Sequence, residues 1–174
     1  MILLLNIPAQ AQKYFTRDGI VSFSSEAPLE TIEATNHKAT SVIDLETGRM
    51  EIAILVKAFQ FEKALMQEHF NENYMESSKF PKALFKGTIQ NLDAVNFDQD
   101  GEYEVDVTGD LTIHGVTQAV ETKGTILIES GAITAQSAFT VEVSDYDIKI
   151  PAVVKDNIAK EVAIAVNFNY QLLE

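Results

Sequence analysis

Apolar and polar residues alternate with a period of two along most of the chain. Between 102 and 113, acidic and hydroxyl side chains occupy one face, and the other face carries Tyr103, Val105, Val107, Leu111 and Ile113. The segment 161–172 repeats the pattern, with large apolar side chains at every second position from Val162 to Leu172. Because successive side chains of a β-strand point to opposite faces, both segments are predicted to be strands with one face in a core and the other in water.

Shorter alternating patterns predict further strands near residues 52–56, 83–89, 126–128 and 133–143. Turn-forming sequences lie between the runs, at Asp18-Gly19, Glu46-Thr47-Gly48, Asp100-Gly101 and Ser130-Gly131. Glycine adopts the positive φ angles of tight hairpins without a steric penalty. Consecutive strands are therefore expected to pair as antiparallel neighbours.

One segment, Phe61–Tyr74, departs from this period and is predicted to form a helix. It contains good helix formers and neither Gly nor Pro. Pro81 favours an extended backbone at the residue before it, so the chain is expected to return to a strand near Lys82. A second irregular stretch, Ser144–Asn157, is long enough to hold a helical turn.

The fold class expected from these elements is all-β. About eight strands and one helix must bury their apolar faces in a sandwich or in a closed barrel. Closure is favoured because the long strands near the two ends of the sequence would otherwise be exposed edges. An eight-stranded antiparallel barrel has room for one narrow ligand. The chain has 174 residues, a length typical of one domain, and residues 13–174 are expected to form it.

The charge balance and the apolar runs exclude several classes of partner. Thirteen Lys and Arg against 26 Asp and Glu give a net charge of −13, which disfavours nucleic acid. No run approaches the roughly 18 apolar residues of an integral membrane segment. Residues 1–12 carry no charge and end near Ala9-Gln10-Ala11, an A-x-A cleavage pattern. This predicts a signal-peptide remnant and export to the periplasm or medium; an apolar edge strand is the alternative.

Residues suited to catalysis or metal binding do not form a recognisable arrangement. His37, His69 and His114 lie in separate segments without the spacing of a metal site. Residues 96–101 resemble the first half of a calcium loop, but position 12 of that loop is Val107, so a hairpin turn is predicted. The chain has no cysteine, no nucleophile elbow and no phosphate-binding glycine loop. No enzyme activity, metal site or required cofactor is predicted.

Three segments resemble the YceI-like family. The run 109–117, GDLTIHGVT, is similar to the family signature G-x-L-T-x-H-G-V-T, and residues 69–87 are similar to its H-F/L...F/Y-P-x-x-x-F segment. Residues 144–148 are similar to a third stretch, R-x-D-Y/F-G-I, with Val143 where Arg is common and Asp147 where Gly is. The segments occur in the family's order and spacing, and the resemblance covers the chain from about Tyr14 to the end.

The resemblance implies a lipocalin-like barrel that carries a long isoprenoid-type chain in its lumen, is exported and is not known for catalysis. A non-catalytic carrier of an isoprenoid or quinone-like lipid is therefore expected. The residues predicted to line the lumen are Ile54, Val56, Phe85, Val105, Val107, Ile126, Phe139, Val141, Ile164, Val166 and Phe168. Three helix residues, His69, Asn71 and Tyr74, are predicted to close one mouth.

Two other functions stay open on the sequence. One is a barrel with a filled core that acts through protein contacts, for example as a homodimer. The other is an enzyme acting on a bound lipid. Strand parity places His114 with the polar side chains of its strand, so its imidazole is predicted to be structural and to bond groups of the turn before Val116.

Overall fold

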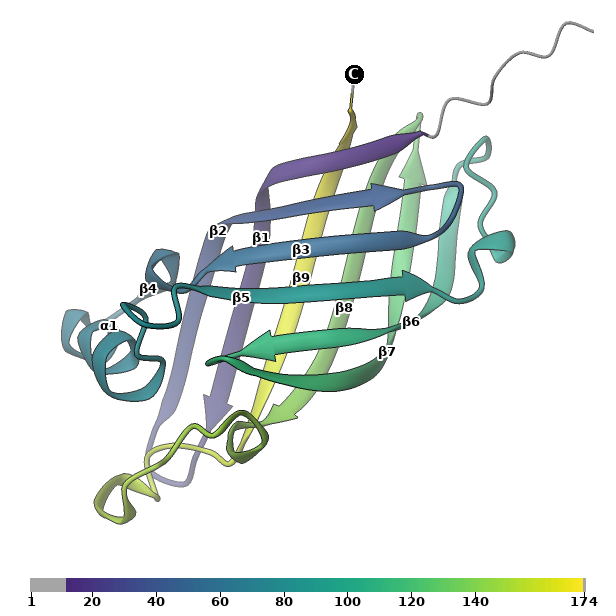
Figure 1. The fold of residues 1–174 in the computed structure, drawn as a ribbon. Helices are drawn as coiled ribbons and strands as arrows, with labels where there is room; N and C mark the ends of the chain where they lie inside the picture. Colours follow the sequence, from purple (N-terminus) through teal and green to yellow (C-terminus); the bar gives the residue numbers. More distant parts are fainter. Residues whose placement is uncertain (1–11, 174) are drawn as a thin grey trace, which may run out of the picture.

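The computed structural model describes residues 12–173, and most of them lie in β-strands (Figure 1). The cleavage pattern Ala9-Gln10-Ala11 and segment 1–11 as a whole lie outside the described residues. The long strands are β1 (Lys13–Glu26), β2 (Thr31–Asp44), β3 (Arg49–Leu55), β5 (Lys82–Ile89), β6 (Gly101–Ile113), β7 (Val116–Glu129), β8 (Ala132–Glu142) and β9 (Glu161–Leu172).

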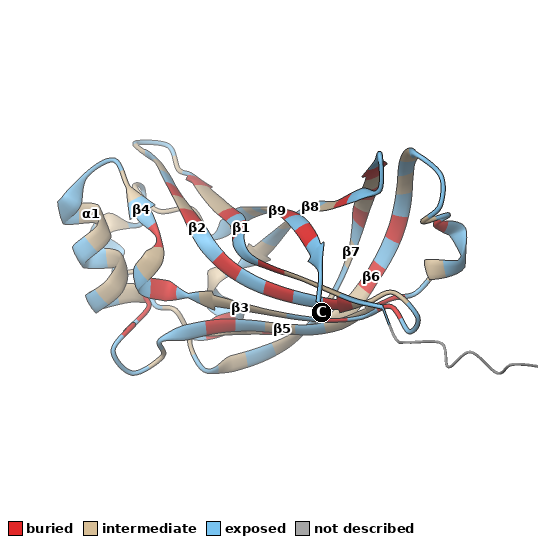
Figure 2. Cartoon of the chain, turned by 90° about the horizontal axis from the view of Figure 1, so that it is seen from above, coloured by how far each residue is buried: buried red, intermediate tan, exposed pale blue. Residues whose placement is uncertain are grey.

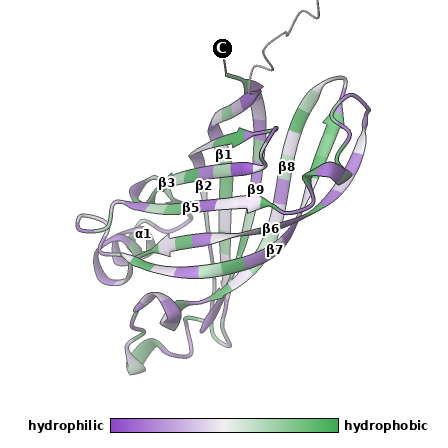
Figure 3. Ribbon diagram, turned by 45° about the vertical axis from the view of Figure 1, so that its right-hand side comes forward, coloured by the Kyte–Doolittle hydropathy of each residue, from purple (hydrophilic) through white to green (hydrophobic). Residues whose placement is uncertain are grey.

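These eight strands form a closed antiparallel barrel. Each pairs with its neighbours along the chain, and β1 pairs with both β2 and β9. A two-residue strand, β4 (Gln60–Phe61), adds to the end of β2. The predicted up-and-down barrel is confirmed. Its side chains alternate as expected, with buried and exposed positions following one another along the strands (Figure 2) and hydrophobic positions alternating with hydrophilic ones (Figure 3).

The predicted turn at Asp18-Gly19 is wrong. Gly19 lies inside β1, where the register with β2 shifts, and a Cβ atom there would lie 2.4 Å from Cδ1 of the Phe168 ring. Glycine is needed at this position because a buried ring packs against the backbone. The turns at residues 46–48 and 130–131 do join hairpins, and Gly101 begins β6 after an irregular loop.

The predicted helix is shorter than expected. Helix α1 spans Ala64–His69 and continues into a π-helical turn, Phe70–Tyr74. The predicted start at Phe61 is wrong because Phe61 pairs with Ala34 of β2. The helix lies at one end of the barrel (Figure 1). The connection from β8 to β9 lies at the same end and contains two helical turns, Val143–Tyr146 and Ala152–Val154.

The opposite end of the barrel, near the C-terminus of the chain, is filled by packed side chains. Ile43, Ile128 and Tyr170 are buried there, and the hydroxyls of Ser41 and Tyr170 are hydrogen-bonded at 2.7 Å. Buried polar groups are stable in a core when they are paired in this way. The barrel therefore has one packed end and one end covered by the helix and the β8–β9 connection.

Candidate functional site

A cavity of about 450 Å³ occupies the barrel interior. All eight long strands contribute inward-facing residues to it, and further residues come from the β1–β2 turn, from the segment 56–75 that contains β4 and α1, and from the β8–β9 connection. The wall is almost entirely apolar, as the period-two pattern requires when each strand turns one face inward. Its volume falls within the range of roughly 300–1,000 Å³ that is usual for small-molecule sites.

The residues predicted to line the lumen all lie on the cavity wall: Ile54, Val56, Phe85, Val105, Val107, Ile126, Phe139, Val141, Ile164, Val166 and Phe168. Of the three predicted mouth residues, His69 and Tyr74 also lie on the wall, and Asn71 does not. The Asn71 side-chain amide instead donates a hydrogen bond to the Gln67 carbonyl at 2.9 Å, which turns it back along the helix. Contact between these residues and a lipid stays a prediction.

Four phenylalanines join α1 to the barrel wall. Phe23 comes from β1, Phe59 and Phe61 from the segment before the helix, and Phe70 from the π-helical turn. Phe70 contacts each of the other three rings, with centroids 5.0–5.8 Å apart. Aromatic contacts of this kind contribute about 0.5–1.5 kcal/mol each beyond the burial of their area. The cluster forms part of the cavity wall and fixes the helix over this end.

These phenylalanines were not among the predicted lumen residues. Phe59 and Phe61 have the spacing of neighbours on one face of a strand, which is the signal that was available. The helix predicted over Phe61–Tyr74 includes Phe61 and so hides this signal. The pairing of β4 with β2, which places Phe61 on the wall, is a tertiary contact that the local pattern does not contain.

Two glycines opposite each other shape the wall beneath Phe85. Gly87 and Gly109 pair across β5 and β6, and a Cβ atom on either would lie 2.6 Å or less from the Phe85 ring. At Gly109 the same atom would also lie 2.5 Å from the Lys86 carbonyl oxygen. The Phe85 ring therefore packs against glycine backbone that carries no side chain. The space on the other side of the ring stays open and forms part of the cavity.

The His114 imidazole connects segments that border the cavity. Its Nε2 lies 2.8 Å from Glu76 Oε2 and its Nδ1 lies 3.1 Å from the Tyr146 carbonyl oxygen. Its ring also packs against Phe80, with centroids 4.7 Å apart. The structure thus gives His114 hydrogen-bonding partners, but they come from the segment after the helix and from the β8–β9 connection. The predicted partners in its own turn are wrong.

The polar groups on the wall are few and mostly satisfied by the protein. Ser25 Oγ accepts the Ala159 backbone N–H at 2.9 Å, and the Ser137 hydroxyl donates to the Lys123 carbonyl at 2.6 Å. Burial raises the pKa of the Tyr74 and Tyr146 phenols, and the nearby Asp145 adds to the rise at Tyr146. Both phenols therefore remain protonated at neutral pH and can donate a hydrogen bond.

Within residues 12–173, no group of three or more His, Asp or Glu side chains is placed to hold a metal ion. None of the helices in this part of the chain has the length and apolar character needed to cross a membrane.

Comparison with known proteins gives relatives in sequence and in structure. A UPF0312 protein of Pseudomonas fluorescens is 32% identical over 85 residues, which are 48% of this chain and 42% of that protein. A UPF0312 protein of Pseudomonas putida is 27% identical over 126 residues, 68% of this chain and 62% of that protein. The matched regions thus span less than two thirds of the length of these relatives.

Among solved structures, a polyisoprenoid-binding domain from Saccharophagus degradans has a TM-score of 0.81 at 14% identity, covering 94% of this chain and 100% of that one. Burkholderia cenocepacia BcnA has a TM-score of 0.71 at 19% identity, covering 88% and 96%. These likenesses are of fold. The model of the YceI-like domain matches residues 17–170, so the chain belongs to the YceI-like family.

Proposed function

We propose that this protein is a non-catalytic carrier that holds a long hydrophobic lipid, isoprenoid or quinone-like, in the barrel lumen. The observation that carries the proposal is the apolar cavity of about 450 Å³, which is lined by residues from every long strand. Apolar surface moved from water into such a wall is stabilised by about 25 cal/mol per Å². The polyisoprenoid-binding domain of the same fold from Saccharophagus degradans supports the choice of ligand class.

The cavity also favours this function over the two alternatives. A barrel with a filled core would bring its inward side chains into contact, and these side chains leave open space. An enzyme acting on the lipid needs a nucleophile beside a base. The wall hydroxyls of Ser25, Thr122 and Ser137 bond backbone groups or one another, with no histidine paired to them among the described residues.

Mass spectrometry of the purified protein tests the proposal. Native spectra and organic extracts of protein prepared without detergent are expected to contain a bound lipid, because release from an enclosed apolar site is slow. A protein that carries no lipid and takes up none when incubated with isoprenoid alcohols or quinones would contradict the carrier function.

A pair of tryptophan variants locates the lipid. Val107→Trp fills space in the lumen and is expected to reduce the lipid retained, with the fold preserved. Glu102→Trp places the same side chain on the exposed face of the same strand and is expected to retain lipid normally. If Val107→Trp instead lowers stability by about 1–3 kcal/mol, as overpacking does, and lipid content is unaltered, the lumen is not the site.

We further propose that the protein is exported and acts in the periplasm or outside the cell. The uncharged segment 1–12 with its Ala9-Gln10-Ala11 pattern supports this. N-terminal sequencing of the protein recovered from fractionated source cells is expected to show, in the periplasm or medium, a chain that begins after Ala11. Recovery of the uncleaved chain from the cytoplasm would contradict export.

A further inference from the structure

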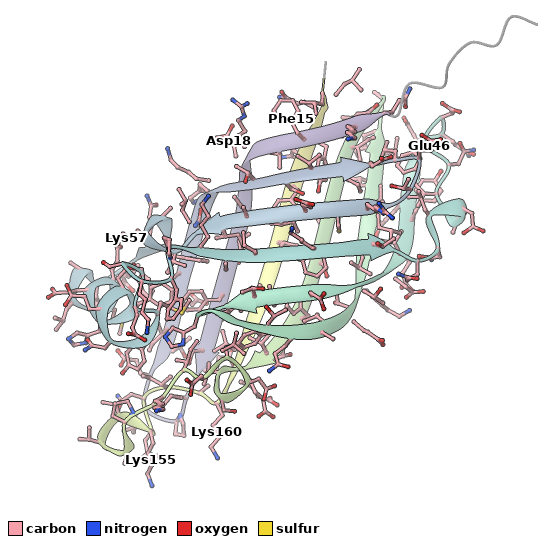
Figure 4. All side chains as sticks on the ribbon, in the orientation of Figure 1. Phe15, Asp18, Glu46, Lys57, Lys155 and Lys160 are labelled. Atoms are coloured by element: carbon pink, nitrogen blue, oxygen red, sulfur yellow. The ribbon has the colours of Figure 1, made fainter. Side chains whose placement is uncertain are left out.

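The cavity wall contains no cation among the described residues. None of the residues lining it is Lys or Arg, and Glu30 is its one carboxylate, although the chain has 13 Lys and Arg in all. Figure 4 shows Lys155 and Lys160, from the connection that covers the cavity, extending outward from the barrel. Lys57, near the helix, bonds the exposed Ser78 hydroxyl at 3.3 Å.

An anionic head group would therefore meet no compensating charge in the lumen. Burying an unpaired phosphate or carboxylate is costly because its hydration is lost and nothing replaces it. Lys63 lies 3.2 Å from Glu30, but its side chain is 63% exposed and it neutralises that carboxylate first. The Lys63–Glu30 pair therefore supplies no net positive charge, and Asp145, beside Tyr146, adds repulsion to any anion entering at this end.

The wall does offer hydrogen bonds to an uncharged head group. Tyr74, Tyr146 and His69 lie on it, and no protein partner bonds their side-chain polar atoms within residues 12–173. His114 bonds Glu76, two residues after Tyr74, and also the Tyr146 carbonyl, so the two segments that carry the phenols are held together. A carbonyl or hydroxyl oxygen can accept from a neutral phenol without any ion being buried.

We infer that the lumen selects lipids with an uncharged head group, such as prenyl alcohols and quinones, over lipids with a phosphate or carboxylate head. The inference rests on the proposed carrier function and names the ligand class that this site takes.

Competition between two lipids with the same chain tests the inference. Lipid-free protein is incubated with equal concentrations of geranylgeraniol and geranylgeranyl diphosphate, and the bound lipids are quantified by mass spectrometry. The alcohol is expected to exceed the diphosphate about tenfold or more. Equal binding, or an excess of the diphosphate, would overturn the selectivity and leave the carrier function standing. Binding of neither lipid would contradict the carrier function itself, and the inference with it.

Two charge-reversal variants distinguish an effect of charge on the cavity wall from an effect of the net charge of the molecule. Glu30→Lys and Glu129→Lys each change the net charge from −13 to −11, but Glu129 is exposed at the opposite end of β7 from the helix. Glu30→Lys is expected to raise the diphosphate share about tenfold, and Glu129→Lys to leave it within about twofold. Equal effects of the two variants, with circular dichroism showing both folded, would overturn a role for the wall.

Discussion

The burial of the Tyr170 phenol makes the stability of the barrel depend on pH in the alkaline range. The two oxygens lie 2.7 Å apart in the packed end, and Tyr170 is 6% exposed. Burial raises the pKa of Tyr170 from its ordinary value of 10.0 to about 12, with the Ser41 hydrogen bond acting weakly in the other direction. The native state therefore keeps the phenol proton at pH values where the unfolded chain has lost it.

The sign and size of the effect follow from proton linkage. Between pH 10 and pH 12 the unfolded chain binds fewer protons than the native state, so stability falls as the pH rises. A difference of about two pKa units corresponds to about 2.7 kcal/mol. This contribution is fully present below pH 10 and is lost as the pH rises through 12.

Guanidinium unfolding, followed by far-UV circular dichroism from pH 8 to pH 12, measures this contribution of Tyr170 to the free energy of unfolding. At pH 8, Tyr170→Phe is expected to be less stable by about 1–3 kcal/mol, because the buried Ser41 hydroxyl loses its partner. From pH 10 to pH 12 the wild type is expected to lose about 2–3 kcal/mol more than the variant, since other titrations are common to both. Ser41→Ala keeps the tyrosine and should keep the wild-type slope. Parallel slopes for wild type and Tyr170→Phe would refute the assignment.

Two further substitutions test the wall and its supports. His114→Ala removes both hydrogen bonds of the imidazole and is expected to cost about 1–3 kcal/mol in thermal melts while lipid content is unchanged; unchanged melting with loss of lipid would show that His114 acts on the ligand. Gly109→Ala brings a Cβ atom to 2.5 Å from a backbone oxygen and is expected to cost about 2 kcal/mol in denaturant unfolding, whereas Gly101→Ala, with 3.3 Å to its nearest neighbour, should stay within about 0.5 kcal/mol. Equal midpoints for the two alanine variants would contradict the close packing at Gly109.

The barrel was predictable from the sequence wherever the inward face of a strand is large and apolar. Strands β3 and β5–β9 each carry a clear alternation, and the positions on their inward faces followed from parity. The alternation does not predict β1 and β2 individually; in β2 the buried positions include the small or polar residues Ala34, Asn36 and Ser41. Asn36 is buried because its amide donates to the Leu55 carbonyl at 2.9 Å, a partner 19 residues away that the local pattern does not contain.

The sequence predicts which residues line the cavity, but it does not predict how much open space they leave. Parity placed Val105, Val107 and Phe139 on the inner surface, but open space depends on how side chains from opposite walls meet. Phe85 lies against the backbone of two glycines, and that contact depends on the register between β5 and β6. Asn71 was misplaced because the helix changes to a π-helical turn at Phe70, which alters the side-chain directions that a regular helix would give.

The pairing of β1 with β9 governs how the chain must fold during synthesis. Phe23 and Ile164 are partners although about 140 residues separate them, and contacts so distant in sequence slow folding. At about 5–20 residues per second, the ribosome completes β9 only after every other strand of the barrel has been made. Until then β1 and β8 each present an unpaired edge, which can join the edge of another chain. Translation that stops before Glu161 would leave both edges permanently open, so truncated chains are expected to aggregate rather than form a smaller barrel.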